Sequence, residues 1–189
     1  TDARMPVIRI ANPAWVADAV DLERTYADEE GRMRVAVRLA HENVVHDTGG
    51  PFGAAVFDAA GRIVGLGVNM VVPSNNSALH AEMVAFMMAQ ARVGSYTLGA
   101  PGMSDHVLYT SCEPCAMCLG ATFWSGVKRV VFAATREDAS ELFDEGPVFP
   151  ASYAYLEERG IRFHGAFLRQ EGRAPLELYR DRRGERSNG

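Results

Sequence analysis

The amino-acid sequence predicts an α/β domain in which a mixed sheet carries helices on both faces. A predicted helix and a two-stranded hairpin come first, and the rest of the chain alternates between helix and strand. A hairpin makes antiparallel neighbours whereas strand–helix–strand units make parallel ones, so together they give a mixed sheet. The chain has 189 residues, of which 48% are hydrophobic, and this suffices for one domain with a sizeable core.

Periodicity and turn residues set the boundaries of the predicted elements. Over residues 29–46 apolar side chains recur at helical spacing, and the Thr-Gly-Gly-Pro segment at 48–51 then ends the helix. Residues 1–28 are expected to form an N-terminal extension with a helix after Pro13. Residues 29–189 are expected to form the domain, which ends in a charged tail from Arg173 that can be helical. Strands are predicted over 53–57, 62–72, 107–109, 128–133 and 161–168, with a turn at 58–61 and a loop at 73–77. Further helices are predicted over 79–92, after Pro114, over 138–142 and over 151–159.

Net charge and cysteine usage narrow the function classes. The formal net charge of −5 argues against binding to a long polyanion such as RNA or DNA. Charged residues interrupt the apolar runs well before the ~20 residues of a membrane-spanning helix, and residues 1–13 lack the pattern of a secretory signal. All three cysteines lie between Cys112 and Cys118, where they staple no loop, so the sequence favours a cytoplasmic protein with metal or redox chemistry.

Two short segments combine residue types that bind a catalytic metal. His80-Ala81-Glu82 and Pro114-Cys115-Ala116-Met117-Cys118 each follow a loop and open a predicted helix. A catalytic zinc takes three protein ligands, from His nitrogen and Cys thiolate, and keeps an open position for water. His80, Cys115 and Cys118 supply three such ligands, with both thiols on one helix face near its positive end. Glu82, two residues after His80, can carry protons for a water that zinc makes more acidic.

Other interpretations fit parts of this pattern. A histidine at a helix start is most often a cap or a core residue, and a single C-x-x-C pair is also typical of redox sites. Cys112 adds an overlapping C-x-x-C, but an iron–sulfur run would need a further cysteine where the chain has Thr122. Neither metal-free redox chemistry nor a cap explains His80 together with Glu82. The joint H-x-E and P-C-x-x-C pattern is the signature of zinc-dependent nucleobase deaminases, which leaves Cys112 as a buried spectator.

With these motifs the chain resembles the cytidine deaminase superfamily, and within it the bacterial guanine deaminases. The resemblance runs from about residue 30 to about residue 150. It implies a three-layer α/β/α sandwich around a mixed five-stranded sheet, a zinc ion as cofactor, and hydrolytic deamination of guanine to xanthine and ammonia. The matching segments are Gly49–Ala54, Asn69, Ser74-Asn75, His80–Glu82 and Tyr109–Ala121.

The resemblance also implies a substrate pocket. Phe52 would form one wall, because aromatic faces stack on flat heterocycles with about 1–3 kcal/mol per base. Asn69 would grip the purine through its amide donor and acceptor. The alternatives are that Phe52 is a core residue and that Asn69 forms a turn. Trp124, just after the cysteine motif, would form another wall, although buried packing explains it equally well.

A second carboxylate is expected from the segment Phe143-Asp144-Glu145-Gly146. Glu145 fits best the residue that the guanine deaminases place at the amino edge of the substrate, with Asp144 beside it, and an acidic surface loop is the alternative. The backbone near Ala81 would orient the base. Glu82, helped by Glu145, would move protons to the ring nitrogen and to the departing amine.

Other functions stay open at this point. A tRNA adenosine deaminase has the same zinc motif but must bind a polyanion. A cytosine or ammeline deaminase would use a similar pocket. A zinc-stabilised binding module without turnover would have no use for Glu82.

The resemblance further implies a homodimer that exchanges C-terminal segments. Residues 176–189 and the extension up to Asp28 depart from the family pattern.

Overall fold

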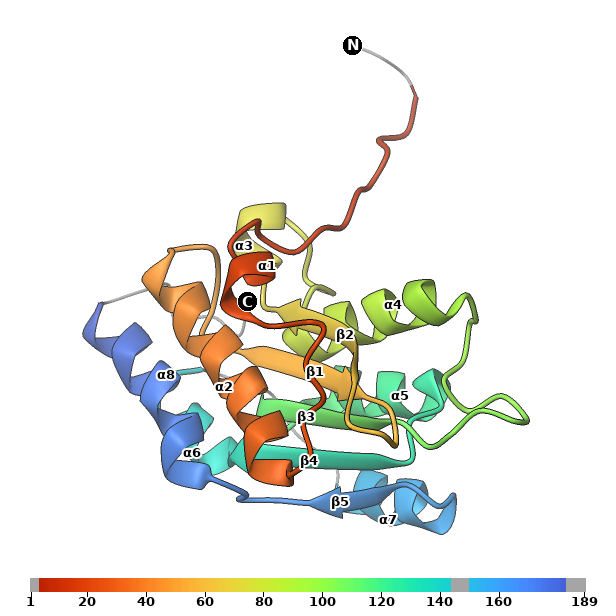
Figure 1. The fold of residues 1–189 in the computed structure, drawn as a ribbon. Helices are drawn as coiled ribbons and strands as arrows, with labels where there is room; N and C mark the ends of the chain where they lie inside the picture. Colours follow the sequence, from red (N-terminus) through yellow and green to blue (C-terminus); the bar gives the residue numbers. More distant parts are fainter. Residues whose placement is uncertain (1–3, 144–149, 183–189) are drawn as a thin grey trace.

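Five strands form one mixed sheet in the order β2-β1-β3-β4-β5 (Figure 1). The structure is a computed structural model, and it describes residues 4–143 and 150–182. Strand β1 pairs antiparallel with β2 and β3, whereas β3, β4 and β5 are parallel, which confirms the predicted mixed five-stranded sheet. The strands are β1 (Gly53–Phe57), β2 (Ile63–Val68), β3 (Val107–Cys112), β4 (Arg129–Ala134) and β5 (Arg162–His164).

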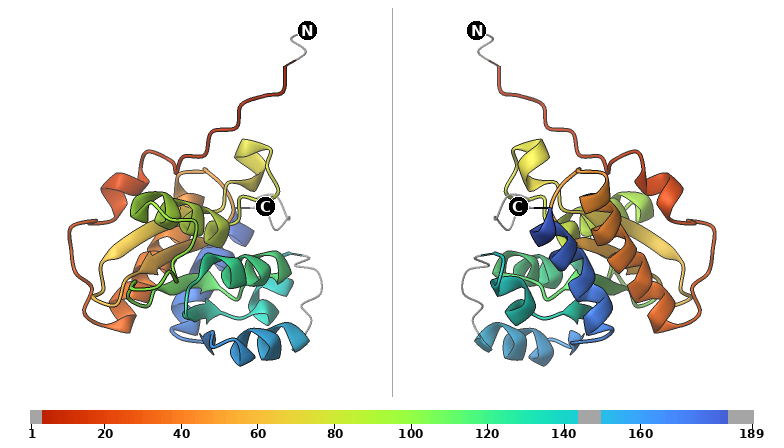
Figure 2. Two further views of the ribbon diagram at one scale, coloured as in Figure 1. Left: turned by 90° about the vertical axis from the view of Figure 1, so that its right-hand side faces the viewer. Right: turned by 90° about the vertical axis from the view of Figure 1, so that its left-hand side faces the viewer.

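Helices cover both faces of the sheet, as Figures 1 and 2 show. On one face α2 (Glu29–Val45) and α8 (Arg169–Asp181) contact each other and the strands beneath them. On the other face lie α4 (Ala81–Val93) and α5 (Ala116–Ser125), with α7 (Pro150–Glu158) against α5 and β5. The short helices are α1 (Val16–Ala19), α3 (Val71–Ser74) and α6 (Arg136–Ser140). The three-layer α/β/α sandwich is therefore confirmed, and among the described residues no helix has the length and apolar character to cross a bilayer.

The strand predicted over 62–72 is shorter than expected. Strand β2 stops at Val68, and α3 replaces what was predicted as the end of the strand. The reason is local, because the Oδ1 atom of Asn69 accepts the backbone N–H of Val71 at 3.3 Å. An asparagine that bonds to nearby backbone in this way competes with the sheet ladder. The chain consequently leaves the sheet at Asn69.

Two other strand boundaries also differ from the prediction. Strand β3 runs to Cys112 rather than to residue 109, because its parallel register against β4 continues to the pair Cys112 and Ala134. Strand β5 covers only three residues of the predicted 161–168. Ala166 and Leu168 have left-handed φ values of 55° and 54°, which a strand does not accommodate. They turn the chain into α8, which begins before the predicted charged tail.

Helix α4 packs directly on the backbone of β2 through small residues on both sides. A Cβ atom at Gly67 would lie 2.1 Å from the carbonyl oxygen of Ala81 and 2.5 Å from the amide nitrogen of Ala85, so only glycine fits there. Gly65 has the same relation to Ala85 and Ala89, about one turn further along the helix. This close approach fixes the N-terminus of α4 beside the point where β2 ends.

Part of the N-terminal extension is packed on the domain. Val16 and Tyr26 are buried in the core cluster on the α2 side of the sheet. The side-chain amide of Asn12 donates to the carbonyl oxygen of Leu66 at 2.9 Å and so covers part of the edge strand β2. Residues 4–9 are exposed and project away from the body (Figure 2), whereas Ile10 packs against the core cluster.

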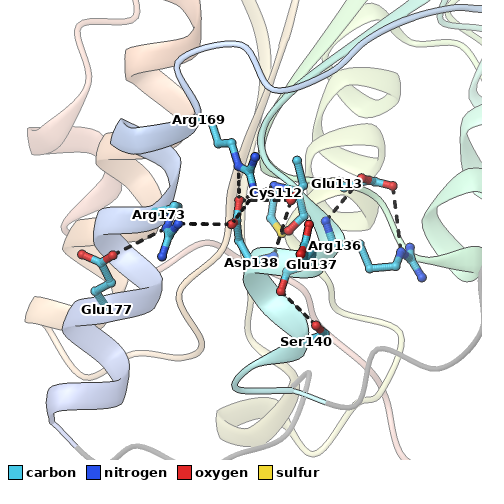
Figure 3. Close-up of polar contacts among 10 residues, drawn as sticks. Cys112, Glu113, Arg136, Glu137, Asp138, Ser140, Arg169, Arg173 and Glu177 are labelled. Atoms are coloured by element: carbon cyan, nitrogen blue, oxygen red, sulfur yellow. Dashed lines mark hydrogen bonds and ion pairs between the residues drawn. The ribbon is translucent and has the colours of Figure 1, made fainter.

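A buried carboxylate ties α8 to α6 (Figure 3). Helix α6 begins earlier than predicted because Thr135 and Asp138 form a capping box at its start. The Asp138 side chain is only 4% exposed. Arg169 donates two hydrogen bonds to it at 2.9 and 2.8 Å, and Arg173 approaches to 3.6 Å. The hydrogen bond from Arg169 is the main reason why the pKa of Asp138 falls to about 2.

Replacing Asp138 by asparagine should lower the free energy of unfolding at pH 7 by about 1–3 kcal/mol, because the shape is kept while charge-assisted hydrogen bonds are lost. The folded-state pKa is below the unfolded-state value. The contribution is therefore present in full above about pH 5 and is lost as the pH falls towards 2. Urea unfolding of both proteins between pH 7 and pH 3 measures it.

The exposed pair Arg34–Glu171 offers a matched control, because it links α2 to α8 at 3.1 Å. Glu171→Gln should change stability by less than about 0.5 kcal/mol. Equal losses in the two variants, or an Asp138→Asn loss as large at pH 3 as at pH 7, would contradict the role given to Asp138.

Candidate active site

The N-termini of α4 and α5 bring three metal-binding side chains together. His80 is the N-cap of α4, Cys115 is the N-cap of α5, and Cys118 lies in the first turn of α5. The Nδ1 atom of His80 lies 3.5 Å from Sγ of Cys115 and 3.7 Å from Sγ of Cys118, and all three donor atoms lie within 4.8 Å of one another. Tetrahedral zinc, with Zn–S and Zn–N bonds of about 2.3 and 2.0 Å, places sulfur and nitrogen ligands about 3.5 Å apart. The donor set therefore fits zinc.

The environment of the donor set distinguishes the two thiols. Hydrogen bonds from Cys118 and His80 lower the pKa of Cys115 to about 4, although burial opposes this shift. The pKa of Cys118 is raised well above its usual range by the contact with Cys115 and by burial. A divalent cation held between the two sulfurs favours the deprotonated form of both.

Glu82 lies beside the donor set rather than in it. It is the second residue of α4, and only 7% of the residue is exposed. Its carboxyl group contacts the Cys118 thiol, and burial, followed by the charge of Cys115, raises the pKa of Glu82. A carboxyl group in this place can hold or release a proton next to the donor set, which is the requirement for a general acid–base group.

A narrow pocket opens on the donor set and on Glu82. Phe52 forms part of its wall, and the Phe52 ring also contacts the Phe143 ring with centroids 5.3 Å apart. Asn69 is 1% exposed, and its Oδ1 atom accepts the backbone N–H of Gly50 at 3.4 Å, which orients the amide. An aromatic wall and an oriented amide suit a flat polar heterocycle. The pocket is lined by Phe52, Asn69, His80, Glu82, Cys112, Glu113 and Cys115.

The remaining predicted site residues lie elsewhere. Ala81 is the first residue of α4 and is fully buried next to His80. Trp124 is 77% exposed and lines an apolar groove between α5 and α7 rather than the pocket, because it lies on the outward face of α5. Asp144 and Glu145 fall outside the residues that the structure describes.

Glu113 is a pocket residue to which the sequence analysis gave no role. Its carboxylate accepts the backbone N–H of Arg136 at 3.3 Å and the hydroxyl of Tyr153 at 2.9 Å, and Figure 3 shows it facing Arg136. Arg136 also donates to the carbonyl oxygen of Pro114 at 2.9 Å. These bonds fix the loop that presents Cys115. The sequence does show a charged residue between Cys112 and Cys115, but it does not show what Glu113 binds, because its partners lie 23 and 40 residues away in sequence.

Comparison with known proteins assigns the family. A family model described as the cytidine and deoxycytidylate deaminase zinc-binding region matches residues 27–134. The matched region holds the three donors and Glu82, and it covers more than half of the chain. The chain belongs to this family. The family match confirms the prediction that the chain is a zinc-dependent hydrolytic deaminase.

Within the family the chain is similar to bacterial guanine deaminases. It is 39% identical to guanine deaminase of Bacillus subtilis over 82% of this chain and 95% of the relative. The solved guanine deaminase of Nitrosomonas europaea is 38% identical with a TM-score of 0.88, over 95% of this chain and 100% of that chain. A solved variant in complex with 8-azaguanine is 39% identical with a TM-score of 0.87, over 93% and 96%. A tRNA-specific adenosine deaminase of Buchnera aphidicola is 30% identical over 74% of this chain and 85% of the relative.

Removing one thiol ligand should remove the metal. Cys115→Ala is expected to lower the zinc content of the purified protein at least about tenfold, because two remaining protein ligands do not complete a zinc site. Elemental analysis after dialysis measures the content. Cys112→Ala is the matched control, because Cys112 lies in the same pocket but outside the donor set, and it should keep full zinc. Equal zinc in the Cys115 variant and the unchanged protein would refute this donor set.

Proposed function

We propose that this protein hydrolyses guanine to xanthine and ammonia, with zinc bound by His80, Cys115 and Cys118. The observation that carries the proposal is that one pocket joins this donor set and Glu82 to Phe52 and Asn69. Similarity to relatives named guanine deaminases, and to a variant solved with 8-azaguanine, supports guanine as the base.

The reaction replaces the amino group at C2 of guanine by the oxygen of water. A C–O bond forms, the C–N bond breaks, and ammonia leaves. One proton of the water ends on the ring nitrogen next to C2, and the other ends on the departing amino group. Bound to its three donors, zinc supplies the Lewis acidity that makes water nucleophilic at neutral pH. The side chains of the pocket hold the base, exclude bulk water and move these two protons.

Glu82 is the proton carrier in this proposal. Its carboxyl group lies against Cys118 and lines the pocket, so it can reach both the attacking water and the base. It takes a proton from the water and delivers it to the ring nitrogen next to C2, which makes C2 more electrophilic. It then assists proton transfer to the leaving amino group. Its burial keeps competing water away from the proton path.

Phe52 and Asn69 hold the base in the proposed complex. The Phe52 ring, supported by Phe143, offers a flat surface on which the purine stacks. Two backbone N–H groups hold the Oδ1 atom of Asn69, and this sets the amide orientation that the base meets. The backbone at Ala81 orients the ring further. The proposed roles of Glu145 and Asp144 at the amino edge rest on the family resemblance alone.

We further propose that the protein is a homodimer and that it works in the reducing environment of the cytoplasm. Cys112, Cys115 and Cys118 form no disulfide in the structure, and a reducing compartment keeps Cys115 and Cys118 available as ligands. Helix α8 packs on α2 and β4 of its own chain. An exchange of residues 176–189 between two copies stays a prediction of the family resemblance.

Glu82→Gln should retain zinc but lower kcat for guanine by about 10²–10⁴-fold, because the amide keeps the size of the side chain and cannot carry the proton. Ammonia release and elemental analysis on the same preparation measure both quantities. Glu157→Gln, at an exposed position on α7, should leave kcat unchanged. A Glu82→Gln protein as active as the unchanged one would remove Glu82 from the mechanism.

A panel of bases tests the substrate. Guanine should give the highest kcat/KM for ammonia release among guanine, adenine, cytosine, cytidine, guanosine and ammeline. Asn69→Ala should lower kcat/KM for guanine by about 10²-fold, because a buried polar contact to the base is lost. Faster release from another base would correct the substrate, and no release from any of them would refute the enzyme.

A further inference from the structure

The side chain of Asn43 joins the two segments that carry the base-binding residues. Asn43 lies in α2 and is 0% exposed. Its amide nitrogen donates to the carbonyl oxygen of Gly50 at 2.8 Å and to the carbonyl oxygen of Asn69 at 2.9 Å. The first carbonyl lies two residues before Phe52, and the second belongs to Asn69 itself. One buried amide therefore fixes both segments to α2.

The orientation of this amide is fixed from its other side. Thr48 donates its hydroxyl to Oδ1 of Asn43 at 2.7 Å, and its backbone N–H bonds to the Asn43 carbonyl at 3.0 Å. All the polar atoms of the Asn43 side chain are thus used. A buried polar group that is fully bonded in this way specifies one arrangement of its partners.

The two segments also contact each other tightly. Gly49 has a φ of +152°, and a Cβ atom there would lie 1.9 Å from the Asn69 carbonyl oxygen and 2.9 Å from the Asn43 amide nitrogen, so only glycine allows the approach. The N–H of Asn69 bonds to the carbonyl of Phe52 at 3.2 Å, and the N–H of Gly50 bonds to Oδ1 of Asn69 at 3.4 Å. A shift of either segment moves the other.

The N-terminal extension reaches this network through Trp15. The indole Nε1–H donates to the Thr48 hydroxyl at 2.9 Å. The Trp15 ring also stacks on His46, with centroids 5.1 Å apart and 6° between the planes. A chain of hydrogen bonds therefore runs from Trp15 through Thr48 and Asn43 to Asn69.

We propose that Asn43 is a positioning residue for the deamination reaction, and that Trp15 and Thr48 hold it in place. Asn43 is absent from the pocket lining, so it acts through the Asn69 and Phe52 segments. Without its amide the Gly50 and Asn69 carbonyl groups each lose a donor, although the Gly50 carbonyl keeps the N–H of Phe52 at 2.8 Å. The two segments are then free to shift relative to α2. A misplacement of about 1 Å at a reacting centre costs about 10²-fold in rate. This inference rests on the proposed function for its kinetic test.

Asn43→Ala should keep zinc and lower kcat/KM for guanine about 10–100-fold. Trp15→Phe removes the bond from the indole to the Thr48 hydroxyl, and Thr48→Val removes this bond together with the bond to Oδ1 of Asn43. Both variants leave the Asn43 amide in place and should lower kcat/KM about 2–10-fold. Asn12→Ala is the matched control, because Asn12 also donates a 2.9 Å hydrogen bond to a backbone carbonyl, at the far edge of β2. It should leave kcat/KM unchanged even if the melting temperature falls. If the loss of kcat/KM is proportional to the fall in melting temperature in all four variants, including Asn12→Ala, the proposal is overturned.

A double variant tests whether Asn43 acts through Asn69. Asn43→Ala combined with Asn69→Ala should lose less kcat/KM than the product of the two single losses, because part of the effect of Asn43 passes through Asn69 and residues that act through one another are not additive. Multiplied losses would show that Asn43 acts by another route and would overturn the proposal.

A measurement without substrate separates this inference from the proposed function. Amide hydrogen exchange of Gly50 and Val71, whose N–H groups bond to Oδ1 of Asn69, should speed up at least about tenfold in Asn43→Ala relative to the core amide of Val131. If the unchanged protein releases no ammonia from any base, the function fails while this test still applies. Unchanged exchange at both amides would overturn the positioning role.

Discussion

The site depends on the meeting of two helix N-termini at the end of a sheet. His80 is the N-cap of α4 and Cys115 is the N-cap of α5, and these two donors lie 35 residues apart in sequence. Their distance of 3.5 Å is set by packing, because α4 is seated on β2 through Gly67 and α5 follows the central strand β3. A shift of α4 relative to β2 would move His80 relative to the thiols of α5, and a zinc site tolerates little change in its ligand distances. Both helix ends also bring positive dipoles to anionic sulfur.

Buried polar groups maintain the geometry around this meeting point. Asn43 bonds to the Gly50 and Asn69 carbonyls on one side of the pocket, and Glu113 bonds to Arg136 and Tyr153 on the other. Each is largely removed from water, so its bonds are strong and their loss is costly. The pocket walls are therefore held by directional contacts, whereas the sheet and helices beneath them are held mainly by apolar packing.

The sequence determined much of this without any structure. Alternating helix and strand patterns predicted the mixed sheet and its two helical layers, because periodicity reports which face of an element is buried. The joint pattern of His80-x-Glu82 and Cys115-x-x-Cys118 predicted the three metal-binding residues and the acid–base group beside them, because it matches the signature of zinc-dependent deaminases. Errors were local, as at β2, where the side chain of Asn69 bonds to the backbone and ends the strand.

Only the tertiary structure decided the partners of residues that meet across long stretches of sequence. The spacing of α2 places Asn43 on its buried face, four residues after Leu39 and seven after Ala36. The pattern does not give its partners, since the bond to the Asn69 carbonyl spans 26 residues. Glu113 and Trp124 show the same limit, because one faces the pocket and the other faces solvent although both flank the same motif. Local patterns encode the type of element and its buried face. The directions in which single polar side chains point follow from how those elements pack.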